Sequence, residues 1–160
     1  MKPATLLAIT CCSLLLFAAC KKSEDKKDDN TTTATLTIRQ MLLAGKWQET
    51  AQTLTASYMG KDTSMDLHAQ LKDCEKDDFV TFGDNGVTTK DENTNVCAGN
   101  PQTVGFPWAL LNNDTKLALV DSNPDTFDLE ISSSQMKLKK ITKNSSGDPI
   151  TWLTTLKNIK

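Results

Sequence analysis

Residues 127–139 read FDLEISSSQMKLK, and their pattern indicates the fold. Phe127, Leu129 and Ile131 alternate with acidic residues, and after a Ser-rich link Met136 opens a second alternation with lysines. A period of two is typical of a β-strand with one buried face. A short polar link between two such segments indicates an antiparallel hairpin.

The same alternation recurs along most of the chain, separated by turn residues such as Asn85-Gly86. Hairpin-linked strands with one apolar face favour an antiparallel meander, and about eight of them can close into a barrel without exposed edges. We therefore predict an all-β protein, an eight-stranded antiparallel up-and-down barrel, with a β-sandwich as the alternative. The expected strands cover residues 47–57, 79–82, 87–91, 104–110, 117–119, 127–131, 136–138 and 150–156.

A short helix is expected just before the first strand. Thr37 suits its N-terminal cap, Ile38, Met41 and Leu42 recur at helical spacing, and Gly45 suits its end.

The composition argues against several classes of function. The 160 residues include 18 Lys+Arg against 20 Asp+Glu, which is not the basic balance of a nucleic-acid binder. A single His and no recognisable nucleophile motif leave little material for a catalytic triad or a metal cage. The carboxylates at residues 73–78 are interpreted as a solvated rim. We expect no enzyme, no cofactor and no metal site.

Cys74 and Cys97 are expected to form a disulfide. If Asn85-Gly86 is a two-residue turn, paired residues have numbers that sum to 171, as those of Cys74 and Cys97 do. A three-residue loop, 84–86, would instead leave them diagonal. Either register allows the bridge, and an exported chain meets an oxidising compartment.

The N-terminus has the pattern of an export signal: residues 1–19 combine Lys2, an uncharged apolar run and small residues. Leu16-Phe17-Ala18-Ala19-Cys20 resembles the lipobox of bacterial lipoproteins, which implies cleavage before Cys20 and its attachment to a lipid membrane. Residues 20–34 would then be the lipidated Cys and a flexible polar tether, and residues 35–160 the barrel domain.

The location that this implies is the outer membrane. Lys27-Asp28-Asp29 resembles the surface-export signal of some Gram-negative lipoproteins. Exposure at the cell surface is therefore favoured over a periplasm-facing position.

Gly45-Lys46-Trp47, directly after a short helix, resembles the G-x-W motif of lipocalins. With Cys74, Cys97 and Trp108, residues 36–157 resemble the lipocalin-like domains of small Gram-negative lipoproteins. The resemblance implies that Trp47 closes one end of the barrel. The only Arg is Arg39, so Lys139 or Lys140 is expected to replace the Arg that covers this Trp in lipocalins.

Two functions remain open from the sequence. The first is a membrane-anchored module that binds a small apolar molecule inside the barrel. The second is a ligand-free scaffold whose loops meet a protein or a glycan, favoured by the absence of a distinctive polar residue in the predicted lumen. The candidate lumen residues are Phe82, Phe106, Trp108, Phe127, Leu129 and Trp152.

Overall fold

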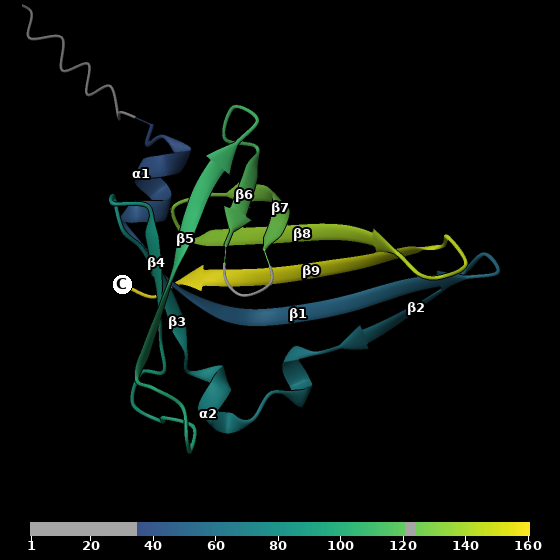
Figure 1. Cartoon of the computed structure of the whole chain (residues 1–160), viewed down its shortest axis with the longest axis horizontal. Helices are drawn as coiled ribbons and strands as arrows, with labels where there is room; N and C mark the ends of the chain where they lie inside the picture. Colours follow the sequence, from purple (N-terminus) through teal and green to yellow (C-terminus); the bar gives the residue numbers. More distant parts are fainter. Residues whose placement is uncertain (1–34, 121–123) are drawn as a thin grey trace, which may run out of the picture. The chain divides into compact units, whose positions relative to one another are not determined.

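The computed structural model describes residues 35–120 and 124–160, and these form a closed antiparallel barrel with short helices (Figure 1). The predicted signal peptide, residues 1–19, and the predicted lipidated Cys and tether, residues 20–34, lie outside the described residues. The elements are α1 (Ile38–Leu43), β1 (Lys46–Tyr58), β2 (Lys61–Asp66), the 3₁₀ helix η1 (His68–Gln70), α2 (Asp73–Lys76), β3 (Phe79–Phe82), β4 (Val87–Asp91), β5 (Thr103–Leu111), β6 (Lys116–Leu119), β7 (Asp125–Ile131), β8 (Gln135–Lys143) and β9 (Pro149–Asn158).

Pairing between the first and last strands closes the barrel. From β3 to β9 each strand pairs with the next in the chain, and β9 returns to β1. Strands β1 and β3–β9 therefore form the predicted eight-stranded barrel, and the β-sandwich alternative is wrong.

The sequence did not predict β2, which is an additional strand outside the closed ring. On one edge of β1, Lys46–Gln48 pair with β3 and Thr53–Tyr58 pair with β2. Every residue of β2 is exposed, so its sequence carries none of the apolar alternation that marks the other strands.

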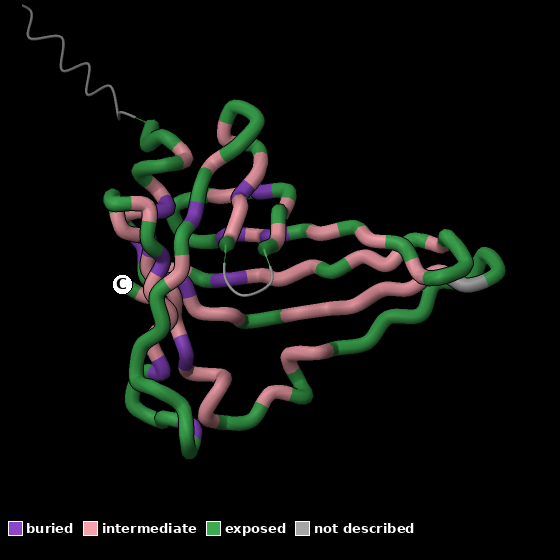
Figure 2. Tube along the Cα trace, in the orientation of Figure 1, coloured by how far each residue is buried: buried purple, intermediate pink, exposed green. Residues whose placement is uncertain are grey.

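The predicted helix is confirmed as α1, and it covers one end of the barrel interior. The Thr37 side chain accepts a hydrogen bond from the Gln40 backbone N–H, and the Gln40 side chain accepts one from the Thr37 N–H, a capping box. Leu42 and Trp47 are fully buried, and Trp47 Nε1 donates to the Leu42 carbonyl at 3.1 Å. Buried residues gather toward this end, whereas the far halves of β1, β8 and β9 are half-buried or exposed (Figure 2).

The single arginine lies over Trp108 and not over Trp47. The Arg39 guanidinium is 5.1 Å from the ring centroid of Trp108 and forms an ion pair with Asp84 at 2.7 Å. Trp108 packs edge-on against Phe82, with ring centroids 5.3 Å apart. A cation from the N-terminal helix thus covers an aromatic pair of the central strands.

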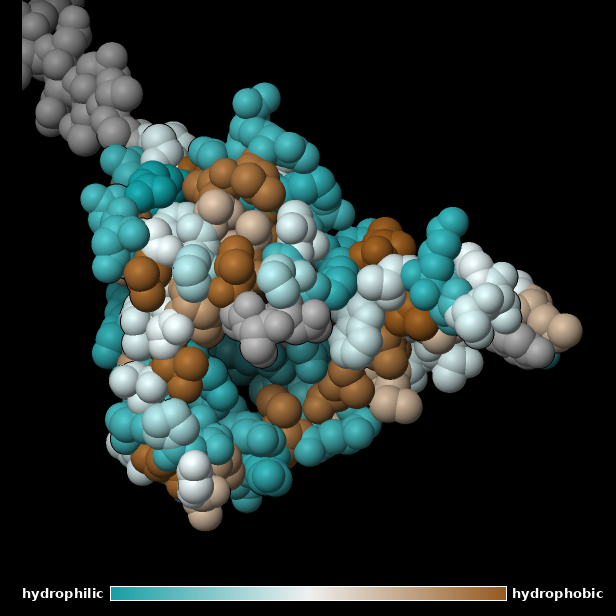
Figure 3. Space-filling view, viewed as in Figure 1, coloured by the Kyte–Doolittle hydropathy of each residue, from teal (hydrophilic) through white to brown (hydrophobic). Residues whose placement is uncertain are grey.

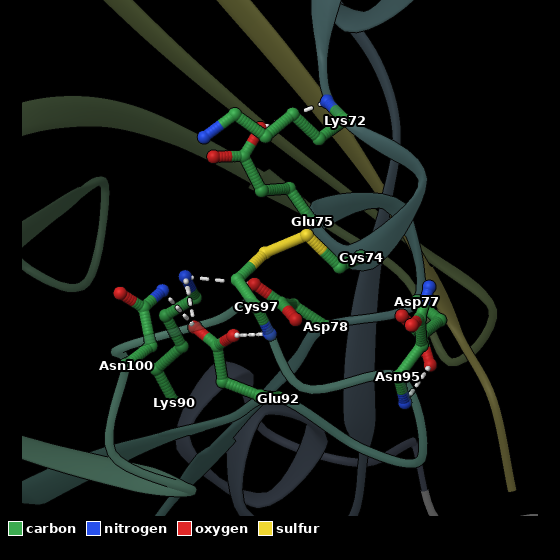
Figure 4. Close-up of a disulfide and its surroundings, with 10 residues drawn as sticks. All are labelled: Lys72, Cys74, Glu75, Asp77, Asp78, Lys90, Glu92, Asn95, Cys97 and Asn100. Carbon is green, nitrogen blue, oxygen red and sulfur yellow. Dashed lines mark hydrogen bonds and ion pairs between the residues drawn. A yellow bond between two sulfur atoms is a disulfide. The ribbon is translucent and has the colours of Figure 1, made fainter.

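The Cys74–Cys97 disulfide is present, and of the two hairpin registers considered for it the three-residue loop is the correct one. Phe82 pairs with Thr88, which leaves the three-residue loop 84–86, with Gly86 at a φ of +77°. Cys74 lies in α2 and Cys97 in the β4–β5 loop, with Cα atoms 5.2 Å apart (Figure 4). Closing 23 residues stabilises the fold by about 3 kcal/mol in the chain-entropy model.

Gly45 is required because the Trp47 ring occupies the space of its missing side chain. A Cβ at residue 45 would lie 2.6 Å from the Trp47 ring. Gly45→Ala is therefore expected to lower the free energy of unfolding by about 1–3 kcal/mol, the usual cost of overpacking. Urea denaturation followed by circular dichroism measures this loss.

Gly105→Ala is the matched control, because a Cβ there would meet Val87 at an ordinary 3.5 Å. This variant should keep or gain stability. Equal stability of the two variants would contradict the role assigned to Gly45.

Candidate functional site

A cavity of about 600 Å³ occupies the barrel interior beyond the buried end. Figure 3 shows a hollow in the surface of the molecule, with both hydrophobic and hydrophilic residues around it. Every strand of the closed ring contributes to its wall, because alternate residues of each strand face inward. The lining residues are Glu49, Gln52, Val80, Phe82, Thr88, Phe106, Leu119, Asp125, Phe127, Met136, Leu138, Lys140, Thr142, Trp152, Thr154 and Leu156.

The structure divides the candidate lumen residues into two sets. Phe82, Phe106, Phe127 and Trp152 line the cavity. Trp108 and Leu129 belong instead to the packed core, where they are 5% and 8% exposed. Trp108 follows Phe106 by two residues, and Leu129 follows Phe127 by two, so all four face inward. Trp108 and Leu129 lie nearer the end that α1 covers, where side chains fill the interior.

The wall of the cavity is far more polar than the sequence predicted. Glu49, Gln52, Asp125 and Lys140 all line it, so the expectation of a lumen without distinctive polar residues is wrong. A β-bulge explains part of the error: the β1–β9 register shifts between Glu49 and Ala51. This shift turns both Glu49 and Gln52 inward, which strict alternation would not do.

Lys140 is one of the two lysines expected to cover Trp47, and neither makes that contact. The Lys140 ammonium forms an ion pair with Asp125 in the cavity wall. Lys139 lies opposite Asp128 in the β7–β8 ladder. The Trp47 ring is covered by α1 instead, and its N–H donates to the carbonyl of Leu42 in that helix. No cation is therefore needed there.

Glu49 is a half-buried carboxylate whose direct ionisable partner is a histidine. Its Oε1 is 3.2 Å from Nδ1 of His68, the first residue of η1. Burial raises the pKa of Glu49, and the nearby His68 and Lys90 offset this rise only in part. His68, the single histidine of the chain, is thus a partly buried partner of a cavity residue.

A second cavity, of about 320 Å³, adjoins the first beneath η1 and α2. Its wall includes Asp78 and Lys90, whose Nζ is 2.7 Å from Asp78 Oδ2. Asp78 is only 9% exposed, and burial raises its pKa. The solvated-rim interpretation is therefore wrong for Asp78, which is buried and paired with Lys90.

Glu92 is a buried carboxylate that the sequence reading missed. It accepts hydrogen bonds from the Cys97 backbone N–H and the Asn100 side chain, both at 3.0 Å (Figure 4). These bonds lower the pKa of Glu92. Thr88, Lys90 and Glu92 recur at every second residue along β4 and just beyond its end. This period of two was the available signal, because residues spaced in this way share one face of a strand.

Two further observations concern cofactors and membranes. In residues 35–120 and 124–160, no three His, Cys, Asp or Glu side chains gather in a way that could hold a metal ion. Within the same ranges, no helix has the length and apolar character needed to span a membrane.

Glu49→Gln is expected to stabilise the fold at neutral pH. The raised pKa means that ionising Glu49 costs folding free energy as the pH rises above the ordinary value of 4.5. Gln cannot ionise, yet it keeps an oxygen for His68. Thermal unfolding should show a higher melting temperature for the variant at about pH 7, and the difference should vanish below about pH 4, where the carboxyl is protonated in both states.

Glu130→Gln is the matched control, because the Glu130 side chain is 80% exposed on the outer face. It should change the melting temperature little at either pH. A Glu49→Gln variant that is less stable than the parent at neutral pH would contradict the argument.

Comparison with known proteins agrees with this architecture. The family described as the lipocalin-like domain matches residues 43–138, from the end of α1 into β8. No curated protein matches the chain. The matched segment holds Gly45, Trp47, both bridged cysteines and most of the cavity wall. The chain therefore belongs to the lipocalin-like domain family, whose members are generally not catalysts.

Proposed function

We propose that the protein is a membrane-anchored carrier that binds a small, largely apolar molecule in its barrel. The cavity supports this proposal: about 600 Å³ is a size that suits a small-molecule site. Four aromatic side chains and several aliphatic ones supply the apolar contact area. Membership of the lipocalin-like domain family is consistent with small-ligand binding.

The cavity also favours the carrier over the ligand-free scaffold. A scaffold needs only a packed interior, and packed interiors contain few voids larger than a water molecule. Here the core at the α1 end is packed, while the remainder of the barrel interior is open. No comparable feature of the described loops favours a protein or glycan partner.

The anchor is proposed from the sequence pattern at Cys20. Lipidation of this residue would attach the carrier to the outer membrane, and the charged segment 21–33 would hold the barrel away from the lipid surface. We propose that the barrel faces the outside of the cell.

Ligand binding can be tested with N-phenyl-1-naphthylamine, an uncharged probe that fluoresces in apolar sites. The protein should bind it saturably. Leu119→Trp places a large ring in the cavity wall and should weaken binding at least about tenfold, which is about 1.4 kcal/mol.

Val120→Trp is the control, because it adds the same ring at the neighbouring, exposed residue. Circular dichroism would confirm that both variants are folded. Absence of saturable binding to the parent protein, or equal binding by both variants, would refute the carrier function.

Anchoring can be tested by expressing the full chain in a Gram-negative bacterium supplied with labelled palmitate. The parent chain should incorporate the label and sediment with the outer membrane, whereas Cys20→Ser should do neither. Cys12→Ser, a change within the expected signal peptide, should retain both. Label on the Cys20→Ser chain would exclude the anchor.

Exposure at the cell surface needs a second experiment. A membrane-impermeant biotin reagent applied to intact cells should modify the parent chain, and lack of modification would place the barrel on the periplasmic side of the outer membrane.

A further inference from the structure

The two adjoining cavities present an excess of negative charge. Their walls contain four carboxylates and two lysines; the carboxylates are those of Glu49, Glu75, Asp78 and Asp125. Both lysines are already paired. Lys140 binds Asp125, and Lys90 lies 2.7 Å from Asp78 and 3.5 Å from Glu92.

Glu49 stands where the two cavities meet. It lines both of them, together with Val80 and Leu156. Its nearest ionisable partner is His68, at 3.2 Å, which carries charge only when protonated. Burial raises the pKa of Glu49, so a ligand cation at this point would compensate a carboxylate that makes no direct ion pair with a lysine or arginine of the described residues.

Two buried polar atoms in the cavity walls also lack hydrogen-bond partners. They are Thr88 Oγ1, in the wall of the larger cavity, and Asp78 Oδ1, in the wall of the smaller one. Both oxygens are themselves buried, so neither contacts a ligand in the cavities. The Asp78 carboxylate nevertheless adds negative charge beside the junction, which favours a cation there.

We propose that the ligand is a cationic amphiphile, a molecule with an apolar body and one protonated amine, and that Glu49 binds the amine. This inference rests on the carrier function proposed above. The apolar body lies against Phe82, Phe106 and Phe127 in the larger cavity, and the ammonium group lies at the junction. There Glu49 accepts its charged hydrogen bond, and Asp78 adds a second carboxylate to the adjoining wall.

The same wall disfavours other ligand classes. A carboxylate ligand would meet Glu49 and two lysines that already hold carboxylates. A neutral alcohol would leave the negative charge of Glu49 uncompensated. Charged hydrogen bonds are roughly twice as strong as neutral ones, so the ammonium should be preferred.

The test uses three ligands with the same ten-carbon chain: decylammonium, decanol and decanoate. Each is titrated against the protein loaded with N-phenyl-1-naphthylamine, which is uncharged, at about pH 7, where the amine and the acid are both ionised. Decylammonium should displace the probe at a concentration at least about tenfold lower than decanol, and decanoate should be the weakest.

Glu49→Gln identifies the residue responsible. It should weaken decylammonium binding at least about tenfold while decanol binding stays within about twofold, since only a charged contact is removed. Glu130→Gln, which removes the same charge from the outer face, should leave all three affinities unchanged. The unchanged decanol binding separates a specific contact from a structural defect.

The outcomes distinguish the two proposals. If decanol binds but decylammonium has no advantage, or if Glu49→Gln keeps the advantage, the cationic-ligand inference is refuted and the carrier function stands. If neither the probe nor any of the three ligands binds, both proposals are refuted.

Discussion

The pairing of β1 with β9 is the constraint on which the rest of the structure depends. It joins the two ends of the domain, from Trp47 opposite Asn158 to Ala56 opposite Ile150. Without it the sheet would have two open edges and no interior. The same ladder contains the bulge after Glu49, so the pairing that closes the barrel also brings Gln52 to the inner face on which Trp47 and Glu49 lie.

The two ends of the barrel interior have opposite characters. At the α1 end, Trp47, Leu42 and Trp108 are buried, and the Trp N–H groups donate to backbone carbonyls. Beyond them, Thr88 and Asp78 keep unpartnered polar atoms, and Glu49 has a raised pKa. Each of these groups disfavours folding. Such local violations are expected at functional sites, and here they border one continuous pair of cavities.

Much of the fold was predictable because it follows from local chemistry. Thr37 and Gly45 mark the ends of α1, and the apolar alternation marks the eight strands of the ring. The polar strand β2 and the helix α2 were missed because neither carries that alternation. The disulfide and the three-residue loop 84–86 were among the predictions, but the expected strand positions of the cysteines were wrong, because Cys74 lies in α2 and Cys97 in a loop.

The apolar alternation along the strands was enough to predict the aromatic lining of the cavity, because inward-facing residues recur at every second position of a strand. Phe82, Phe106, Phe127 and Trp152 were found in this way. Part of the polar lining depended on tertiary structure. Gln52 faces the cavity through a bulge that only the β1–β9 ladder defines, and Asp78 is buried by packing that its sequence neighbours do not indicate. Alternation along one strand indicates that Asp125 and Lys140 face inward, but only the long-range pairing of the strands decides that the two charges meet.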